Sequence, residues 1–192
     1  MELIFVRHGQ GEHNRDIPDR LNIEHPHLTD RGKAQVADLR ASFDFSNEDI
    51  FIVSPTVRTI ETVNILTDGL TQPKKYISPA VGPRMFPQGP ESAAFRCDIA
   101  LPRARIINEY PGFIVMNDFN EPVWLEGINA IEEKKFQELG LGLINWIREQ
   151  GLDRAVIVAH DGTINSYRQL LGERGLTRLD FLGEAGTFKV AL

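Results

Sequence analysis

The sequence comprises 192 residues, of which 42% are hydrophobic and 25% charged, and its formal net charge is −6. A chain of this length can bury a substantial hydrophobic core, so we expect one domain spanning residues 1–192. The negative net charge argues against a nucleic-acid partner bound through bulk electrostatics. A local cluster of arginines would still attract a small anionic substrate.

The composition also bears on where the protein resides. Cys97 is the only cysteine, so no disulfide can form within the chain, which is typical of an intracellular protein. The first residues already have the pattern of a core strand, so we expect no signal peptide. No apolar stretch reaches the roughly eighteen residues that a membrane-spanning helix needs. We therefore expect a soluble, cytoplasmic protein without a membrane partner.

The first part of the chain alternates between strand and helix patterns. An apolar run at 3–6 predicts a buried strand. The polar residues 10–27 predict a loop long enough to carry function. Thr29 or Asp30 can then cap a helix that runs to about residue 42. A second apolar run, at 50–53, predicts another buried strand.

The rest of the chain continues this alternation, with one interruption. Residues 71–122 are rich in proline and lack a clear period, so we expect an irregular insertion packed over one end of the sheet. The other patterns predict a helix with Pro55 in its first turn that ends near residue 68, one or two helices at 123–150, a buried strand at 155–159, a helix at 163–171 and an edge strand at 188–192. Such alternation predicts a three-layer α/β/α sandwich with a mostly parallel central sheet.

Three predicted strands lead into residues that suit anion binding. Arg7, His8 and Gly9 follow the first strand, Arg58 lies in the helix after the second, and His160 follows the third. Because the carboxyl ends of parallel strands share one edge, we expect these residues to converge. Guanidinium groups hold phosphate oxygens, and a guanidinium beside an imidazole favours the neutral, nucleophilic form. Each motif alone could face solvent, but their convergence favours a site for a phosphorylated ligand.

Four motifs together resemble those of a known family. They are Arg7-His8-Gly9 with Asn14, Leu28-Thr29-x-x-Gly32-x-x-Gln35, Ser54-Pro55-x-x-Arg58-Thr59 and the later His160. This set resembles the histidine phosphatase superfamily, which includes phosphoglycerate mutases and fructose-2,6-bisphosphatases. The resemblance covers both ends of the chain, and it implies a phosphoglycerate mutase-like fold.

The resemblance also implies a mechanism. It implies that His8 attacks phosphorus and becomes a phosphohistidine, and that Arg7, Arg58 and His160 hold the phosphoryl oxygens, with help from Asn14. Positioning and charge stabilisation of this kind require neither a metal nor a cofactor. The expected partner is a small-molecule phosphate ester or another phosphorylated substrate, whose identity the sequence does not give.

The proton donor for the leaving oxygen is less clearly marked. In the superfamily a carboxylate of the middle segment has this role, and some relatives show a Glu followed by Cys-Asp at a spacing like that of Glu91 and Cys97-Asp98. We therefore favour Glu91 as donor, with Asp98 as the second candidate. Asp161, at a position where relatives often carry Gly, is a further carboxylate near the pocket. Arg84, Arg96 and Arg105 are candidates for holding the rest of the substrate.

The resemblance favours a metal-independent phosphatase that hydrolyses a phosphomonoester through His8, and two other functions remain open on the sequence alone. Phosphoglycerate mutase activity is disfavoured, because the segment after Asn14 lacks the Gly-Trp element of those enzymes and the middle insertion is short. A non-catalytic relative that binds a phosphorylated ligand would have no need of His8. Four histidines lie close together in the first 27 residues, but none of their spacings matches a known zinc motif, so we expect no metal site.

Overall fold

The computed structural model describes residues 1–89 and 95–192, and within them six strands form one sheet. The strand order is β4-β3-β2-β5-β1-β6, with all neighbours parallel except β1 and β6, which are antiparallel. The strands are β1 (Glu2–Arg7), β2 (Ile50–Val53), β3 (Lys74–Ile77), β4 (Ile114–Val115), β5 (Arg154–Ala159) and β6 (Thr187–Ala191). The sheet is therefore mixed but mostly parallel, as the sequence predicts.

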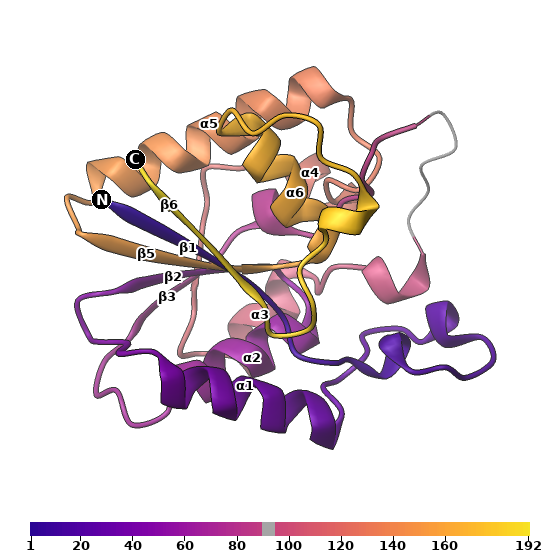
Figure 1. Cartoon of the computed structure of the whole chain (residues 1–192), viewed down its shortest axis with the longest axis horizontal. Coiled ribbons are helices and arrows are strands. Elements are labelled where there is room, and N and C mark those ends of the chain that lie inside the picture. Colours follow the sequence, from indigo (N-terminus) through magenta and orange to yellow (C-terminus); the bar gives the residue numbers. More distant parts are fainter. Residues whose placement is uncertain (90–94) are drawn as a thin grey trace.

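Helices cover both faces of this sheet, so the predicted three-layer α/β/α sandwich is confirmed. Helices α1 and α2 lie on one face, and α5 and α6 lie on the other (Figure 1). The helix bounds in the described residues are α1 (Asp30–Ser42), α2 (Val57–Leu66), α3 (Arg103–Glu109), α4 (Glu121–Glu126), α5 (Glu133–Glu149) and α6 (Asp161–Leu170).

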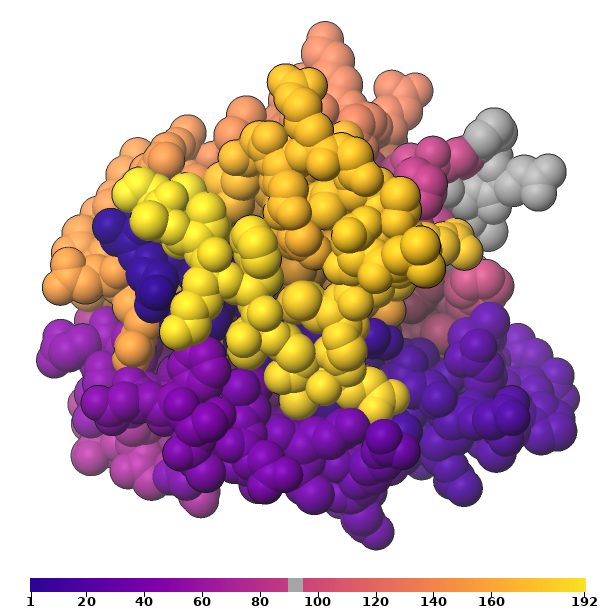
Figure 2. Space-filling model, in the orientation of Figure 1, coloured from indigo at the N-terminus to yellow at the C-terminus, as the bar shows by residue number. Residues whose placement is uncertain are grey.

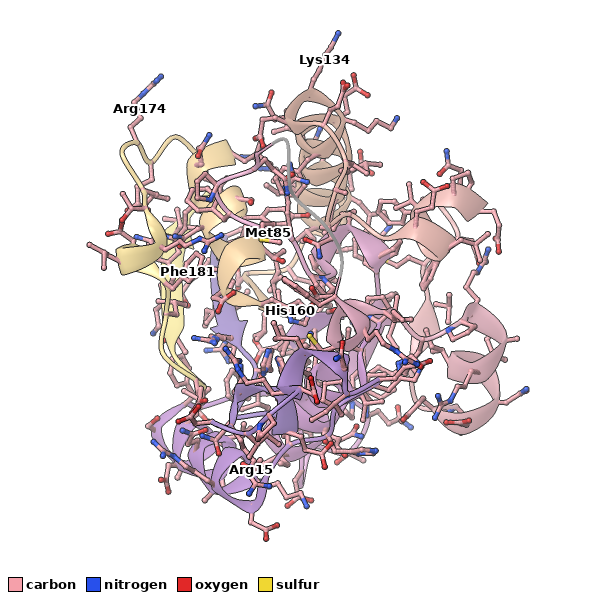
Figure 3. The ribbon with its side chains drawn as sticks, turned by 90° about the vertical axis from the view of Figure 1, so that its right-hand side faces the viewer. Arg15, Met85, Lys134, His160, Arg174 and Phe181 are labelled. Carbon is pink, nitrogen blue, oxygen red and sulfur yellow. The ribbon has the colours of Figure 1, made fainter. Side chains whose placement is uncertain are left out.

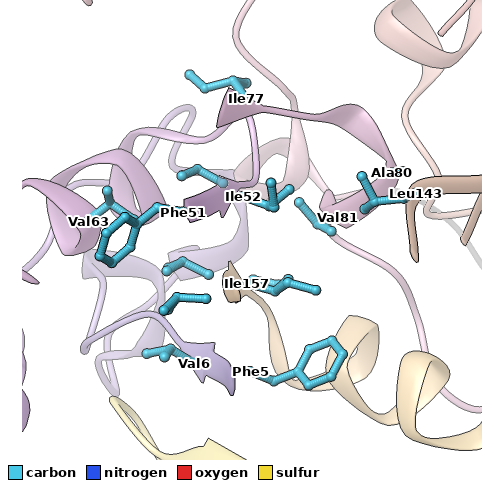
Figure 4. Packing of buried hydrophobic residues seen from close by; sticks show 14 of the residues in the cluster. Phe5, Val6, Phe51, Ile52, Val63, Ile77, Ala80, Val81, Leu143 and Ile157 are labelled. Carbon is cyan, nitrogen blue, oxygen red and sulfur yellow. The ribbon is translucent and has the colours of Figure 1, made fainter. Parts of the chain in front are cut away.

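The central strands β1, β2 and β5 form the middle of the core. Their inner residues are apolar on both faces and almost wholly inaccessible to solvent, because helices cover both sides. Figure 4 shows Val6, Phe51 and Ile157 of these three strands within the packed cluster. At the edge, β6 pairs with β1, and Figure 2 shows the C-terminal residues beside the N-terminal ones.

The parallel order determines where the polar strand ends lie. β5 pairs with both β1 and β2, so the carboxyl ends of these three strands are neighbours. Arg7 ends β1, Ser54 follows β2 and His160 follows β5. This edge of the sheet is where open α/β folds place ligand sites.

The structure differs from the predicted elements at β3–β4 and at Pro55, and it decides between one helix and two for 123–150. β3 and β4 join the sheet within 71–122, where no strand was expected, because their short, partly polar edge sequences lack an apolar run. The helical stretch 123–150 is divided into α4 and α5, since Gly127 has a φ of 69° and ends α4. Pro55 precedes the N-cap residue Thr56 of α2 and therefore lies just outside this helix.

One further property of the helices concerns membranes. No helix in residues 1–89 and 95–192 combines the length and the apolar character needed to cross a lipid bilayer.

Candidate active site

A cavity of about 320 Å³ opens at the carboxyl edge of β1, β2 and β5. Side chains from the strand ends, the loop after β1 and the C-terminal loop line it, and Figure 3 shows His160, Met85 and Phe181 on this side of the molecule. The predicted site residues among its lining are Arg7, His8, Asn14, Arg58, Asp98, His160 and Asp161. Glu91, the favoured proton donor, lies outside the described residues.

The loop that carries His8 is held against the start of α1. A Cβ atom on Gly9 would lie 2.4 Å from the carbonyl oxygen of Gly32, and one on Gly32 would lie 2.1 Å from the carbonyl oxygen of Gln10. Neither position therefore accepts a side chain without a backbone shift. Thr29 caps α1 by accepting a hydrogen bond from the backbone N–H of Gly32. Gly9 and Gly32, which belong to different motifs of the sequence, therefore allow the same close backbone contact, and this contact fixes the loop that carries His8.

The protonation state of His8 follows from its hydrogen bonds. Its Nδ1 lies 2.7 Å from the carbonyl oxygen of Gly9, which can only accept, so the imidazole proton is on Nδ1. Nε2 then carries a free lone pair, toward which Arg58 Nε donates from 3.3 Å. Burial, followed by the charge of Arg58, holds the His8 pKa well below its usual value. The ring is therefore a neutral nucleophile with its reactive nitrogen among the pocket residues.

Arg58 connects most of the groups around the pocket. Its side chain is 1% exposed, and its guanidinium donates to the carbonyl oxygen of Cys97 at 2.7 Å and to His160 Nδ1 at 3.2 Å, as well as to His8. Asp98 Oδ1 lies 3.6 Å from Nη2 of the same side chain. This buried cation faces two neutral imidazoles and one aspartate at 3.6 Å, an arrangement that still favours an incoming anion.

His160 and Arg7 are held by different partners. His160 accepts from Arg58 through Nδ1, so its own proton is on Nε2 and is donated to Ser54 Oγ at 2.8 Å. Arg7 donates to the carbonyl oxygen of Leu182 and forms an ion pair with Asp161 at 2.9 Å. Within the described residues, Arg7 Nε is buried without a hydrogen-bond partner. That N–H is free to donate to a bound oxygen.

Asp98 is the described carboxyl group most deeply placed among these residues. Its Oδ2 accepts a hydrogen bond from Asn129 Nδ2 at 3.0 Å, and Asn129 Oδ1 in turn accepts from the backbone N–H of Met85 at 2.7 Å. Desolvation, only partly offset by the charge of Arg58, raises the pKa of Asp98 above its usual value. A carboxyl group with a raised pKa is suited to carry a proton.

Comparison with known proteins agrees with this arrangement. Residues 3–78 match the model of the histidine phosphatase superfamily (branch 1), a stretch that includes Arg7, His8, Asn14 and Arg58. This part of the chain is therefore similar to the histidine phosphatase superfamily. No curated protein sequence matches the chain.

Solved structures of phosphatases and mutases share the fold over nearly the whole chain. The alpha-ribazole phosphatase of Shigella flexneri has a TM-score of 0.64 and 19% identity, and the match covers 100% of this chain and 91% of that one. A phosphoserine phosphatase of Entamoeba histolytica, in complex with 3-phosphoglyceric acid, has a TM-score of 0.59 at 17% identity, with 98% and 89% covered. A phosphoglycerate mutase of Thermus thermophilus has a TM-score of 0.54 at 20% identity, with 99% and 92% covered.

Three arginines were candidates for holding the rest of a substrate. Arg84 lines the pocket, but its guanidinium is buried and donates to the carbonyl oxygens of Ile128 and Ile131 and to Glu133. Arg96 and Arg105 are not among the lining residues; they pair with Glu24 and Glu109, respectively, at the surface. These three side chains already have partners within the described part of the chain.

Sequence reasoning missed two side chains of the site. His13, 7% exposed, places its ring 5.6 Å from that of His8, and its Nδ1 has no hydrogen-bond partner among the described residues. The only sequence signal was its proximity to His8 in the chain. Asn129 comes from the loop between α4 and α5, which nothing in the sequence linked to Asp98. No group of three or more His, Cys, Asp or Glu able to hold a metal ion occurs in residues 1–89 and 95–192.

The buried histidines predict an acid-sensitive fold. Burial is the largest cause that lowers the pKa of His8, His13 and His160, and it lowers that of His13 to about 3. Below about pH 6.5 the unfolded chain therefore binds protons that the folded chain does not. Stability present above this pH is lost as the pH falls. We expect the free energy of unfolding to drop by about 1.4 kcal/mol per pH unit for each histidine.

Urea unfolding between pH 5 and 7 measures this slope. His13→Gln removes one of the three histidines that make the free energy of unfolding rise with pH. The slope of this free energy against pH should therefore fall by about a third and remain positive. If the free energy of unfolding has the same slope against pH in His13→Gln as in the wild type, His13 is not a neutral, buried imidazole.

Proposed function

We propose that the protein hydrolyses a small phosphomonoester through a phosphohistidine on His8. The observation that carries this proposal is the His8 tautomer: Nδ1–H is bound to the carbonyl oxygen of Gly9, and the Nε2 lone pair meets Arg58 Nε in the pocket. A module that only bound phosphate would need donors at this point, not a lone pair. Two of the structures with this fold are named phosphatases, and one holds 3-phosphoglyceric acid, a small phosphate ester.

The reaction has two displacements at phosphorus. His8 Nε2 attacks, a P–N bond forms, and the P–O bond breaks with its electron pair on the leaving oxygen, which takes a proton from a carboxyl group. A water molecule then attacks the phosphohistidine, gives its proton to the same carboxylate, and the P–N bond breaks. Arg7 and Arg58 stabilise the phosphoryl oxygens throughout, and Asn14 contributes from the loop.

His160 completes the phosphate-binding set. A phosphate dianion beside this ring would favour its protonated form and raise its pKa, so that Nδ1 could donate to an oxygen instead of accepting from Arg58. Asp161 would then compete with the substrate for Arg7, to which it is paired in the unliganded pocket. Hydrolysis on this account needs no metal, because these side chains supply both the positioning and the charge.

The domain assignment is part of the same proposal. We treat residues 1–192 as one histidine phosphatase domain and part of 71–122 as its cover over the site. Segments from this region, including Met85, Phe86 and Asp98, line the cavity. A wild-type protein that releases phosphate from 4-nitrophenyl phosphate in the presence of EDTA would support the phosphatase. A protein that binds phosphate esters without turnover would favour the non-catalytic alternative.

For the proton donor we propose Glu91, with Asp98 as the second candidate and Asp161 as the third. The donor can be found by comparing leaving groups, since 4-nitrophenolate leaves without a proton and an alkoxide does not. In the donor variant, kcat for propyl phosphate should fall by about 10²–10⁴-fold, while kcat for 4-nitrophenyl phosphate falls far less. We expect this selective loss in Glu91→Gln.

The matched variants Asp98→Asn and Asp161→Asn are measured with the same two substrates. If Glu91→Gln slows both substrates equally while Asp98→Asn shows the selective loss, Glu91 is excluded and Asp98 is the donor. The ratio of the two rates, not either rate alone, decides the assignment.

A further inference from the structure

The outer wall of the cavity differs in character from the phosphate-binding floor. It includes Phe86 and Phe181, whose ring centroids lie 6.4 Å apart with an interplanar angle of 59°. Phe86 comes from the segment after β3 and Phe181 from the C-terminal loop; Figure 3 shows Phe181 on the same face of the molecule as Met85 and His160, all of which line the cavity. Two rings from distant segments therefore form an apolar surface beside the site of phosphorus chemistry.

Arg178 is anchored next to these rings. Its Nε donates to the carbonyl oxygen of Phe86 at 3.0 Å, and its Nη2 lies 3.7 Å from the sulfur of Met85. The residue begins the turn η5 (Arg178–Asp180), which Thr177 caps. No carboxylate forms an ion pair with it in the part of the chain that the structure describes. The guanidinium is thus oriented by the pocket wall while its charge is not neutralised there.

The lining of the cavity carries more positive than negative side chains. Five arginines and two aspartates are among the described lining residues, although the whole chain has a net charge of −6. Arg7 and Arg58 face the histidines, each with an aspartate nearby, and Arg84 is paired with Glu133. Arg20 donates to the carbonyl oxygen of His13, and Arg178 adds its positive charge to a pocket that already attracts anions.

We propose that the leaving group of the substrate has a flat apolar part and a second negative charge. The flat part lies against Phe181 and Phe86, and the charge is bound by Arg178. A cavity of about 320 Å³ is at the small end of ligand pockets, which fits one phosphorylated small molecule. This inference rests on the proposed phosphatase function, since it describes the leaving group of that reaction.

The test compares two substrates that differ by one carboxylate, phenyl phosphate and 4-carboxyphenyl phosphate. In Arg178→Gln, kcat/KM for the carboxylated substrate should fall about fivefold more than kcat/KM for phenyl phosphate, the size expected for a well-oriented, exposed charge pair. Arg174→Gln is the matched control, because Arg174 lies on the same loop and extends away from the cavity (Figure 3). This control should leave the substrate ratio unchanged.

A second variant tests the apolar part. Phe181→Ala should lower kcat/KM for phenyl phosphate several-fold more than that for propyl phosphate, because the ring contact is lost only for the aryl group. The subsite would be overturned if Arg178→Gln lowered kcat/KM equally for phenyl phosphate and 4-carboxyphenyl phosphate. It would also be overturned if Arg174→Gln changed the ratio of these two kcat/KM values as much as Arg178→Gln does.

A binding measurement separates this inference from the phosphatase itself. Titration with benzylphosphonate and its 4-carboxy derivative gives the same comparison as a ratio of Kd values, without turnover. If the wild type hydrolyses neither ester, the phosphatase proposal fails, yet a Kd ratio that Arg178→Gln reduces still supports the subsite. A Kd ratio that Arg178→Gln leaves unchanged overturns it.

Discussion

The substitution His8→Ala is expected to lower kcat for phosphomonoester hydrolysis by about four orders of magnitude or more. On our account Nε2 of this ring is the nucleophile, and no other group can take its place in both displacements. The ring is buried and hydrogen-bonded only through Gly9 and Arg58 among the described residues, so its removal leaves a cavity without breaking an ion pair. Initial rates with 4-nitrophenyl phosphate measure the loss.

The neighbouring imidazole provides the control for this prediction. His13 lies in the same pocket, 5.6 Å away between ring centroids. His13→Gln removes an imidazole of equal size and should lower kcat by no more than about tenfold, since the phosphorus bond is not formed there. Comparable losses in the two variants would contradict a nucleophilic role that is specific to His8.

Replacing Arg58 by methionine should have the next largest effect, a fall in kcat/KM of about 10³-fold or more. This guanidinium is the one buried cation that reaches both His8 and His160 in the described structure. It is therefore placed to stabilise the charge that develops on the phosphoryl oxygens, in a site where water does not screen it. Steady-state kinetics on a single ester measure the change.

The stability of the same variant separates catalysis from folding. Burial lowers the pKa of Arg58, which means that its charged form is destabilised in the folded protein. A methionine, which matches the aliphatic part of the arginine side chain, removes this penalty, although it leaves the carbonyl oxygen of Cys97 without its donor. We expect Tm to stay within about 4 °C of the wild-type value. Arg58→Lys should keep the charge but lose the geometry, and a Lys variant with wild-type kcat/KM would contradict the proposed role.

Much of the architecture could be predicted, because the central strands are continuous apolar runs and their ends are marked by polar motifs. The runs at 3–6, 50–53 and 155–159 all became central strands of the sheet. Parallel pairing then brought Arg7, His8, Arg58 and His160 together, as the shared edge required. Uninterrupted apolar runs and the strict topology of parallel sheets made these predictions reliable.

The middle of the chain could not be predicted in the same way. β4 has only two residues, and the partly polar β3 next to it gives no clear apolar run. The contact between Asn129 and Asp98 joins residues 31 positions apart through side chains alone, and no local pattern records such a pair. The tautomer of His160 likewise depends on tertiary partners, Ser54 and Arg58, which its own motif does not record, whereas His8 is bonded to Gly9 of its own motif.

The measurement that tests the central claim most directly is capture of the phosphoenzyme. Wild-type protein is mixed with a phosphate ester labelled with radioactive phosphorus, denatured in alkaline detergent during turnover, and digested to locate the label. We predict a covalent phosphoryl group on His8 that survives base, is lost in acid, and is absent from His8→Ala. Rapid turnover by a wild-type enzyme that never carries this label, or equal labelling of the His8→Ala variant, would contradict the phosphohistidine mechanism.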